Sequence, residues 1–103
     1  MSNLSSDQKV YTLLRDLIAD VLYIDGDDIK PDSRIFDDLG AESIDVLDLR
    51  FRISRTFGFR IEDREMINSL GKGLNSTQIR DKFTVESVTR FIGKRLEQKL
   101  EQA

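Results

Sequence analysis

Apolar residues recur every three to four positions in three stretches of the chain, which is the spacing of one face of an α-helix. The first stretch follows Ser5 and Gln8, which are spaced as a capping box. Its apolar face consists of Val10, Leu13, Leu14, Leu17, Ile18, Val21 and Leu22. A second helix is expected from Ser43 to Phe57, where Gly58 ends it, and a last one follows Thr84, a favourable N-cap residue.

The segments that join these helices are long. Residues 23–41 contain two glycines and the only proline, and a connection of this length is often functional. Its apolar residues, which we expect to hold it against the core, are Ile24, Ile29, Ile35, Phe36 and Leu39. Residues 61–84 predict only a short helix at 64–70 and then a polar turn region at 71–77. Because no stretch alternates as a β-strand does, we expect an all-α fold, a small four-helix bundle.

The expected second helix has apolar residues on two opposite sides. At about 100° per residue, one stripe consists of Val46, Leu49, Ile53 and Phe57, and the other of Ile44, Leu47 and Phe51. Asp48, Arg52 and Arg55 lie on or beside the second stripe, so we expect that side to face solvent. An apolar stripe among charges on an exposed helix indicates a partner-binding surface. The alternative is a helix that is buried on both sides.

The size and composition of the chain narrow the class of protein. With 103 residues, we expect one domain over 1–103, with an ordered core at about 4–96 and a charged tail at 97–103. No apolar run is long enough to insert in a membrane, and no signal peptide precedes the first helix, so we expect a cytoplasmic protein. The absence of His and Cys removes the commonest general base and thiolate metal sites, which argues against an enzyme.

Charge is unevenly distributed, although the net charge is only -3. Residues 25–48 include nine acids against two bases, whereas residues 50–60 include four arginines and no acid. This segregation favours partners with a matching charge pattern, while a solvated surface is the simpler alternative. Since no long basic face emerges, nucleic-acid binding is not expected. The acids around Gly26 lack the ligand spacing of a calcium loop, and the glycines around Lys72 lack that of a phosphate loop.

Ser43 stands at the point where the long connection becomes the second helix. Gly40 allows a tight turn just before it. The free N–H groups and the positive dipole end of the first helical turn favour a phosphate group there, so this hydroxyl is suited to carry a phosphodiester. The alternative is that Ser43 is an N-cap, the usual role of a serine at a helix start.

The run from Asp37 to Asp45 reads DDLGAESID, and together with Pro31 before it and Ile61 after it resembles the acyl carrier protein family. In that family, a separate phosphopantetheinyl transferase moves 4′-phosphopantetheine from coenzyme A onto the serine of an Asp-Ser-Leu triplet. Here the triplet reads Glu42-Ser43-Ile44. The resemblance covers about residues 4–96 and implies a bundle of acyl-carrier type.

The resemblance also implies how the chain would work. Ser43 would hold a phosphopantetheine arm whose thiol carries an acyl group as a thioester. A monomeric carrier would present this group to acyl-carrier synthetases, ketosynthases or acyltransferases. The implied partner-binding residues are Glu42, Ile44, Asp45, Leu47, Asp48, Phe51 and Arg55. The implied acyl pocket is lined by Val46, Leu49, Ile53, Phe57 and Ile61.

Two features depart from carriers used in general fatty-acid synthesis. Arg50, Arg52 and Arg55 stand where such carriers usually keep acids, and residues 61–84 form a longer segment. Specialised carriers of very long or hydroxylated acyl chains for lipid A resemble this chain in having such an extension. The alternatives are an aminoacyl or peptidyl carrier, and a helical protein-interaction module that carries nothing.

Overall fold

The computed structural model describes residues 6–102, and this part of the chain is helical, with no β-strand. The elements are α1 (Ser6–Leu22), the 3₁₀-helix η1 (Gly26–Asp28), α2 (Ser43–Phe57), α3 (Asp63–Asn68), α4 (Ser76–Lys82) and α5 (Val85–Gln102). The expected all-α fold is confirmed. The capping box predicted at Ser5 lies outside the described residues.

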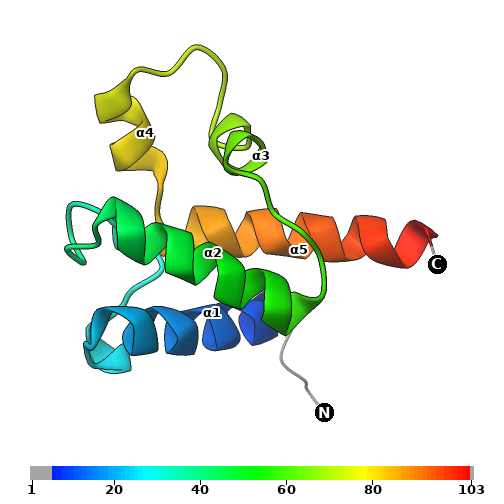
Figure 1. The fold of residues 1–103 in the computed structure, drawn as a ribbon, viewed down its shortest axis with the longest axis horizontal. Helices are drawn as coiled ribbons and strands as arrows, with labels where there is room; N and C mark the ends of the chain where they lie inside the picture. Colours follow the sequence, from blue (N-terminus) through cyan, green and yellow to red (C-terminus); the bar gives the residue numbers. More distant parts are fainter. Residues whose placement is uncertain (1–5, 103) are drawn as a thin grey trace.

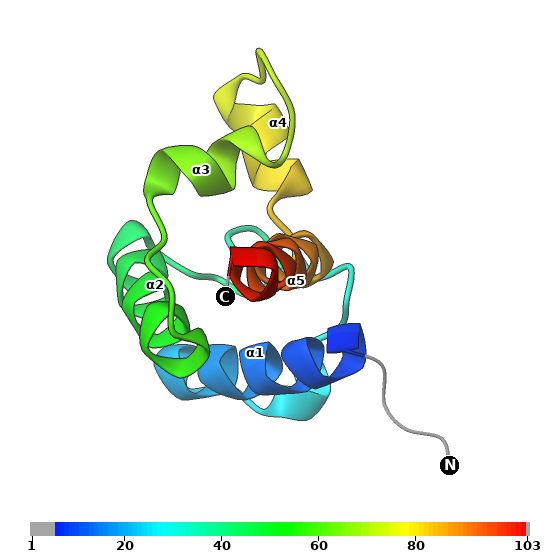
Figure 2. The same cartoon turned by 90° about the vertical axis from the view of Figure 1, so that its right-hand side faces the viewer.

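Three long helices form the body of the molecule. The closest helix pairings are those of α1 with α5 and of α1 with α2. In both views, α3 and α4 lie together on the side of these helices that is opposite α1 (Figures 1 and 2). The long connection between α1 and α2 turns back around one end of the bundle, which brings it beside the start of α5.

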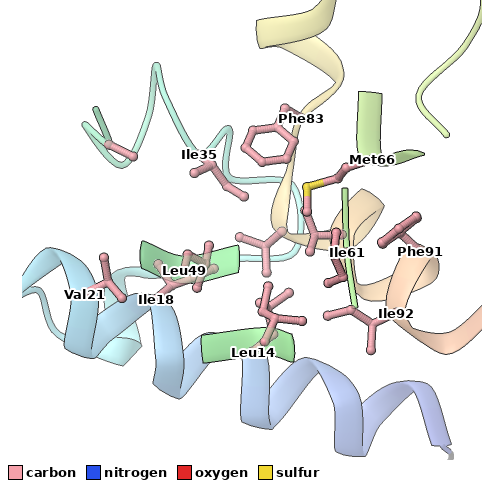
Figure 3. Packing of buried hydrophobic residues seen from close by; sticks show 14 of the residues in the cluster. Leu14, Ile18, Val21, Ile35, Leu49, Ile61, Met66, Phe83, Phe91 and Ile92 are labelled. Carbon is pink, nitrogen blue, oxygen red and sulfur yellow. The ribbon is translucent and has the colours of Figure 1, made fainter. Parts of the chain in front are cut away.

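The core lies between the three long helices. Leu14 and Ile18 of α1, Ile53 of α2 and Ile92 of α5 are almost completely buried there. Figure 3 shows side chains of α1 directed toward Leu49 and Ile92, with Met66 and Phe83 on the far side of the core. The helical spacing in the sequence therefore identified the buried face of α1, apart from Leu13, which is exposed.

The connection from 23 to 41 is fastened to the core as the sequence predicted. Ile29 and Ile35 are buried, and the other three apolar residues are partly buried against the same core. The Ile35 N–H donates to the Phe83 carbonyl at 3.0 Å, and the Val85 N–H donates to the Ser33 carbonyl at 3.0 Å. The loop that leads to α2 is thus bonded to the junction between α4 and α5.

The structure corrects the prediction for the segment 71–84. Polar turns were expected at 71–77, but α4 begins at Ser76, because Asn75 and Gln78 form a capping box. The Asn75 Oδ1 accepts from the Gln78 N–H at 2.9 Å, and the Gln78 Oε1 accepts from the Asn75 N–H at 2.9 Å. The bundle therefore has five α-helices in its described part, and α5 continues through the expected tail to Gln102.

Candidate functional site

Ser43 is the first residue of α2 and is exposed. The turn before it is built on Gly40, whose φ of 77° lies in the left-handed region. The Gly40 N–H donates to the Phe36 carbonyl at 3.1 Å, and the Ala41 N–H donates to the Ile35 carbonyl at 3.1 Å. Because Ala41 is buried, the turn holds Ser43 at a fixed place on the surface.

The N-cap of α2 is Glu42, so the alternative in which Ser43 caps the helix is wrong. The Asp45 carboxylate accepts from the Glu42 N–H at 2.9 Å, as the third helical residue of a capping box does. The Val46 N–H donates to the Glu42 carbonyl at 3.1 Å, so the N–H groups of Ser43 and Ile44 have no carbonyl partner within the helix, and the Asp45 N–H faces the Glu42 side chain. The Ser43 hydroxyl therefore projects from a helix end that favours a phosphate group.

Asp37 and Asp38, which precede Ser43 in the chain, are paired with arginines. Arg34 binds Asp38 through two hydrogen bonds of 2.9 and 3.1 Å, and its guanidinium also reaches Asp81 at 3.1 Å. Arg80 binds Asp37 at 2.9 Å. The hydrogen bond from the Arg34 side chain lowers the pKa of Asp38. The Arg34–Asp81 and Arg80–Asp37 pairs join the loop before Ser43 to α4.

An apolar cleft of about 310 Å³ lies beside Ser43. It is lined by Phe36, Ser43, Val46, Leu47, Asp63, Met66, Ile67, Leu70, Ile79 and Phe83. Ser43 and Asp63 are the polar residues among them, and the rest are apolar. The cleft thus lies between α2 on one side and α3 and α4 on the other, with Ser43 as part of its wall.

Of the five residues predicted to line an acyl pocket, Val46 lines this cleft. Leu49, Ile53 and Ile61 are buried in the core, and Phe57 is partly buried against it. A space of only about 10 Å³ lies next to Leu49, between α1 and α2. That these core residues part to admit an acyl chain stays a prediction.

The second stripe of α2 faces solvent, as predicted. Ile44 is 65%, Leu47 37% and Phe51 57% exposed. Charged residues lie around this stripe, and the Arg52 Nε donates to the Asp48 carboxylate at 3.2 Å. The face is therefore apolar along its centre and charged along its rim, as many interfaces are.

Arg50 has a different role from the other arginines of α2. It is mostly buried, forms an ion pair with Asp63 at 3.3 Å and donates to the Ile61 carbonyl at 3.3 Å. Its guanidinium also lies 5.6 Å from the centre of the Phe51 ring. Arg50 therefore ties α2 to the start of α3.

The acids around Gly26, which were compared with a calcium loop, stabilise the local fold. Asp25 caps η1, since its Oδ1 accepts from the Asp27 N–H at 2.9 Å. Among residues 6–102, no group of three or more acidic, His or Cys side chains is placed to hold a metal ion. No helix in this part of the chain is both long and apolar enough to cross a membrane.

Known proteins match the region around Ser43. A family model described as a phosphopantetheine attachment site matches residues 12–72. The acyl carrier protein AcpXL of Rhizobium meliloti is 40% identical over 63 residues, which are 61% of this chain and 66% of the relative. The acyl carrier protein of Clostridium acetobutylicum is 37% identical over 68 residues, which cover 64% of this chain and 88% of that protein. The first match spans just under two thirds of the Rhizobium protein's length.

Proposed function

Because this chain belongs to the acyl carrier protein family, whose members carry covalent phosphopantetheine, we propose that it holds acyl groups on an arm attached to Ser43. The observation that carries the proposal is the exposed position of the Ser43 hydroxyl at the start of α2. It is exposed at the first residue of α2, Glu42 takes the capping position, and an apolar cleft opens beside it. These residues fit a phosphopantetheine group, which has a phosphate at one end and an acyl cargo at the other.

The attachment step leaves Ser43 as an acceptor and not as a catalyst. A transferase would direct the Ser43 Oγ to the pantetheine-bound phosphate of coenzyme A. A new P–O bond forms, the phosphoanhydride bond breaks, the serine proton leaves, and adenosine 3′,5′-bisphosphate departs. The bound arm supplies a thiol that holds an acyl group as a thioester. The contribution of the chain is to expose Ser43 and to present the loaded arm to enzymes of the cytoplasm.

The exposed stripe of α2 is the proposed docking surface for those enzymes. Its acidic end, with Glu42 and Asp45, surrounds Ser43, while Arg55 lies exposed at the other end. A partner would therefore place basic groups near Ser43 and acidic groups near Arg55. Transferase, synthetase, ketosynthase and acyltransferase are the proposed partner classes.

The finer proposal is a specialised carrier for lipid synthesis, including that of lipid A, and not a general fatty-acid carrier. The charge reversal along α2 supports it, as does the α3–α4 segment, which lengthens the region between the second helix and the last. The apolar lining of the cleft favours an acyl cargo over an aminoacyl or peptidyl one, because peptide groups would lose hydrogen bonds there.

Modification of the full chain by a broad-specificity phosphopantetheinyl transferase tests this function. With coenzyme A and magnesium, intact mass should rise by one phosphopantetheine group in the wild type and not in Ser43→Ala. Ser76→Ala is the matched control, since Ser76 is also exposed, also the first residue of a helix, and also follows a capping residue. An unmodified wild type would favour the helical interaction module, whereas a Ser43→Ala variant that gains the same mass would show that the arm is attached to another residue.

A further inference from the structure

Tyr23 follows α1 directly, in a backbone conformation that suits glycine better than tyrosine. Its φ is 58°, and among residues 6–102 it is the only residue other than glycine with a positive φ. The Ile24 N–H donates to the Ala19 carbonyl at 3.2 Å, which is the hydrogen bond of a Schellman motif with Tyr23 in the left-handed position. Glycine usually occupies that position, because a β-carbon is strained there. Tyrosine therefore costs the fold stability at this site.

The side chain of Tyr23 does not offset this strain by packing within the chain. It is 94% exposed, more than any other large hydrophobic residue in the described part of the chain. Tyr11, by contrast, is half-buried, and its hydroxyl donates to the Ile29 carbonyl at 3.2 Å. Tyrosine is one of the residues that most often anchor protein interfaces. An exposed tyrosine in a strained position therefore indicates a contact with another molecule.

Tyr23 lies at the end of the bundle where α2 begins. Figure 1 shows that α1 ends and α2 starts at this same end. Leu22, the residue before Tyr23, lines a small space together with Ala41 and Asp45, which stand on either side of Ser43 in the chain. A protein that covers Ser43 can therefore also contact Tyr23.

Acidic residues lie on both sides of Tyr23 in the chain. Residues 16–29 contain no lysine or arginine and five exposed aspartates, which are Asp16, Asp20, Asp25, Asp27 and Asp28. Asp16 pairs with Arg15 at 3.5 Å, and the other four form no ion pair within residues 6–102. A partner that receives the tyrosine ring would therefore match this surface with an apolar pocket that has lysine or arginine at its rim.

We propose, as an extension of the carrier function above, that Tyr23 anchors the phosphopantetheinyl transferase on this chain. The transferase is the partner that this function requires to contact Ser43 itself, so it must cover the end of the bundle at which Tyr23 lies. The Tyr23 ring enters an apolar pocket of the transferase, and basic groups around that pocket face the neighbouring aspartates. Burial of the ring offsets the strain of the left-handed backbone. Tyr23 is a docking residue and takes no part in the phosphoryl transfer.

Tyr23→Gly tests this inference, because strain and docking predict opposite effects of the same substitution. The melting temperature of the unmodified full chain should rise, since glycine relieves the left-handed strain. The kcat/KM for its modification with coenzyme A, by the transferase of the organism that encodes this chain, should fall about tenfold or more, through a higher KM at unchanged kcat. Mass spectrometry follows the modification. Tyr23→Phe, which keeps the ring, should retain most of the wild-type kcat/KM.

Leu13→Ala is the matched control, since Leu13 is also an exposed apolar residue and belongs to α1, and it should leave kcat/KM unchanged. An unchanged kcat/KM in Tyr23→Gly, or a loss in kcat alone, would overturn the inference while the carrier function stands. A kcat/KM of Tyr23→Phe as low as that of Tyr23→Gly would exclude an apolar pocket for the ring. If the wild type gains no arm, it is the carrier function that fails.

Discussion

At the scale of single residues, the position of Ser43 depends on the backbone of Gly40. Its φ of 77° is one that side chains disfavour, because the β-carbon approaches the backbone. A β-carbon at Gly40 would meet no other heavy atom within 4 Å. A substitution there would therefore report backbone strain alone, with no contribution from a clash.

Gly40→Ala should lower the free energy of unfolding by about 1 kcal/mol, the usual penalty for a side chain in the left-handed region. Gly40→Asn should lower it less, because asparagine tolerates this conformation. Urea unfolding followed by circular dichroism measures both values. Equal stability of Gly40→Ala and the wild type would show that the turn does not need this backbone conformation.

At the scale of elements, α2 divides its apolar residues between two tasks. Ile53 is completely buried among the three long helices, whereas Ile44 projects into solvent beside Ser43. The same residue type thus serves the core on one side and the proposed docking surface on the other.

Ile53→Ala should destabilise the fold by about 2–5 kcal/mol, because it leaves a cavity in a close-packed core. Ile44→Ala should change stability by no more than about 0.5 kcal/mol, since little is buried there. It should nevertheless slow modification of Ser43, because the transferase is proposed to dock on this face. Thermal unfolding and the rate of mass increase measure the two effects. A large loss of stability in Ile44→Ala would contradict the exposed position of this side chain.

Local patterns in the sequence were sufficient to place α2. Its apolar residues recur at helical spacing, and Gly58 ends it in a left-handed conformation. The pattern failed for α4, which has no buried residue. Its capping pair, Asn75 and Gln78, lies in a polar run that also reads as a turn. In a helix without buried residues, apolar spacing does not reveal the helix, and the capping pair is the local pattern that indicates where it begins.

The candidate site was predicted in part for a similar reason. Ser43 lies within the motif from Asp37 to Asp45, whose residues are adjacent in the sequence, so the sequence alone indicated it. The exposed stripe of α2 follows from helical spacing. The cleft could not be derived in this way, because its lining comes from the loop before α2, from three helices and from residues that follow α3 and α4. Asp37 likewise has its partner in Arg80, far along the chain. Such neighbours are set by tertiary packing.

At the scale of the whole molecule, the chain combines a packed body with a lightly held segment. The three long helices share the core, while α3 contributes one buried residue, Met66, and α4 contributes none. Helices this short gain little stability by themselves. The α3–α4 segment therefore depends on Met66, the neighbouring Phe83 and the ion pairs described above.

Hydrogen exchange should reveal this division. Amides in the middle of α1, α2 and α5 should exchange slowly, as they open only with the core, while those of residues 63–82 should exchange faster through local opening. Exchange followed by NMR at single residues measures the difference in the unmodified chain. Protection of residues 63–82 equal to that of α1 would contradict a separately opening segment.

The ion pairs that hold α4 against the loop before Ser43 determine which solution conditions affect its position. The ion pairs consist of arginine and aspartate, and the sequence contains no histidine. The side chain that most often switches charge near neutrality is therefore absent from these pairs. Dissolved salt acts on them directly, since it screens exposed charges. The position of α4 beside the cleft therefore responds to ionic strength.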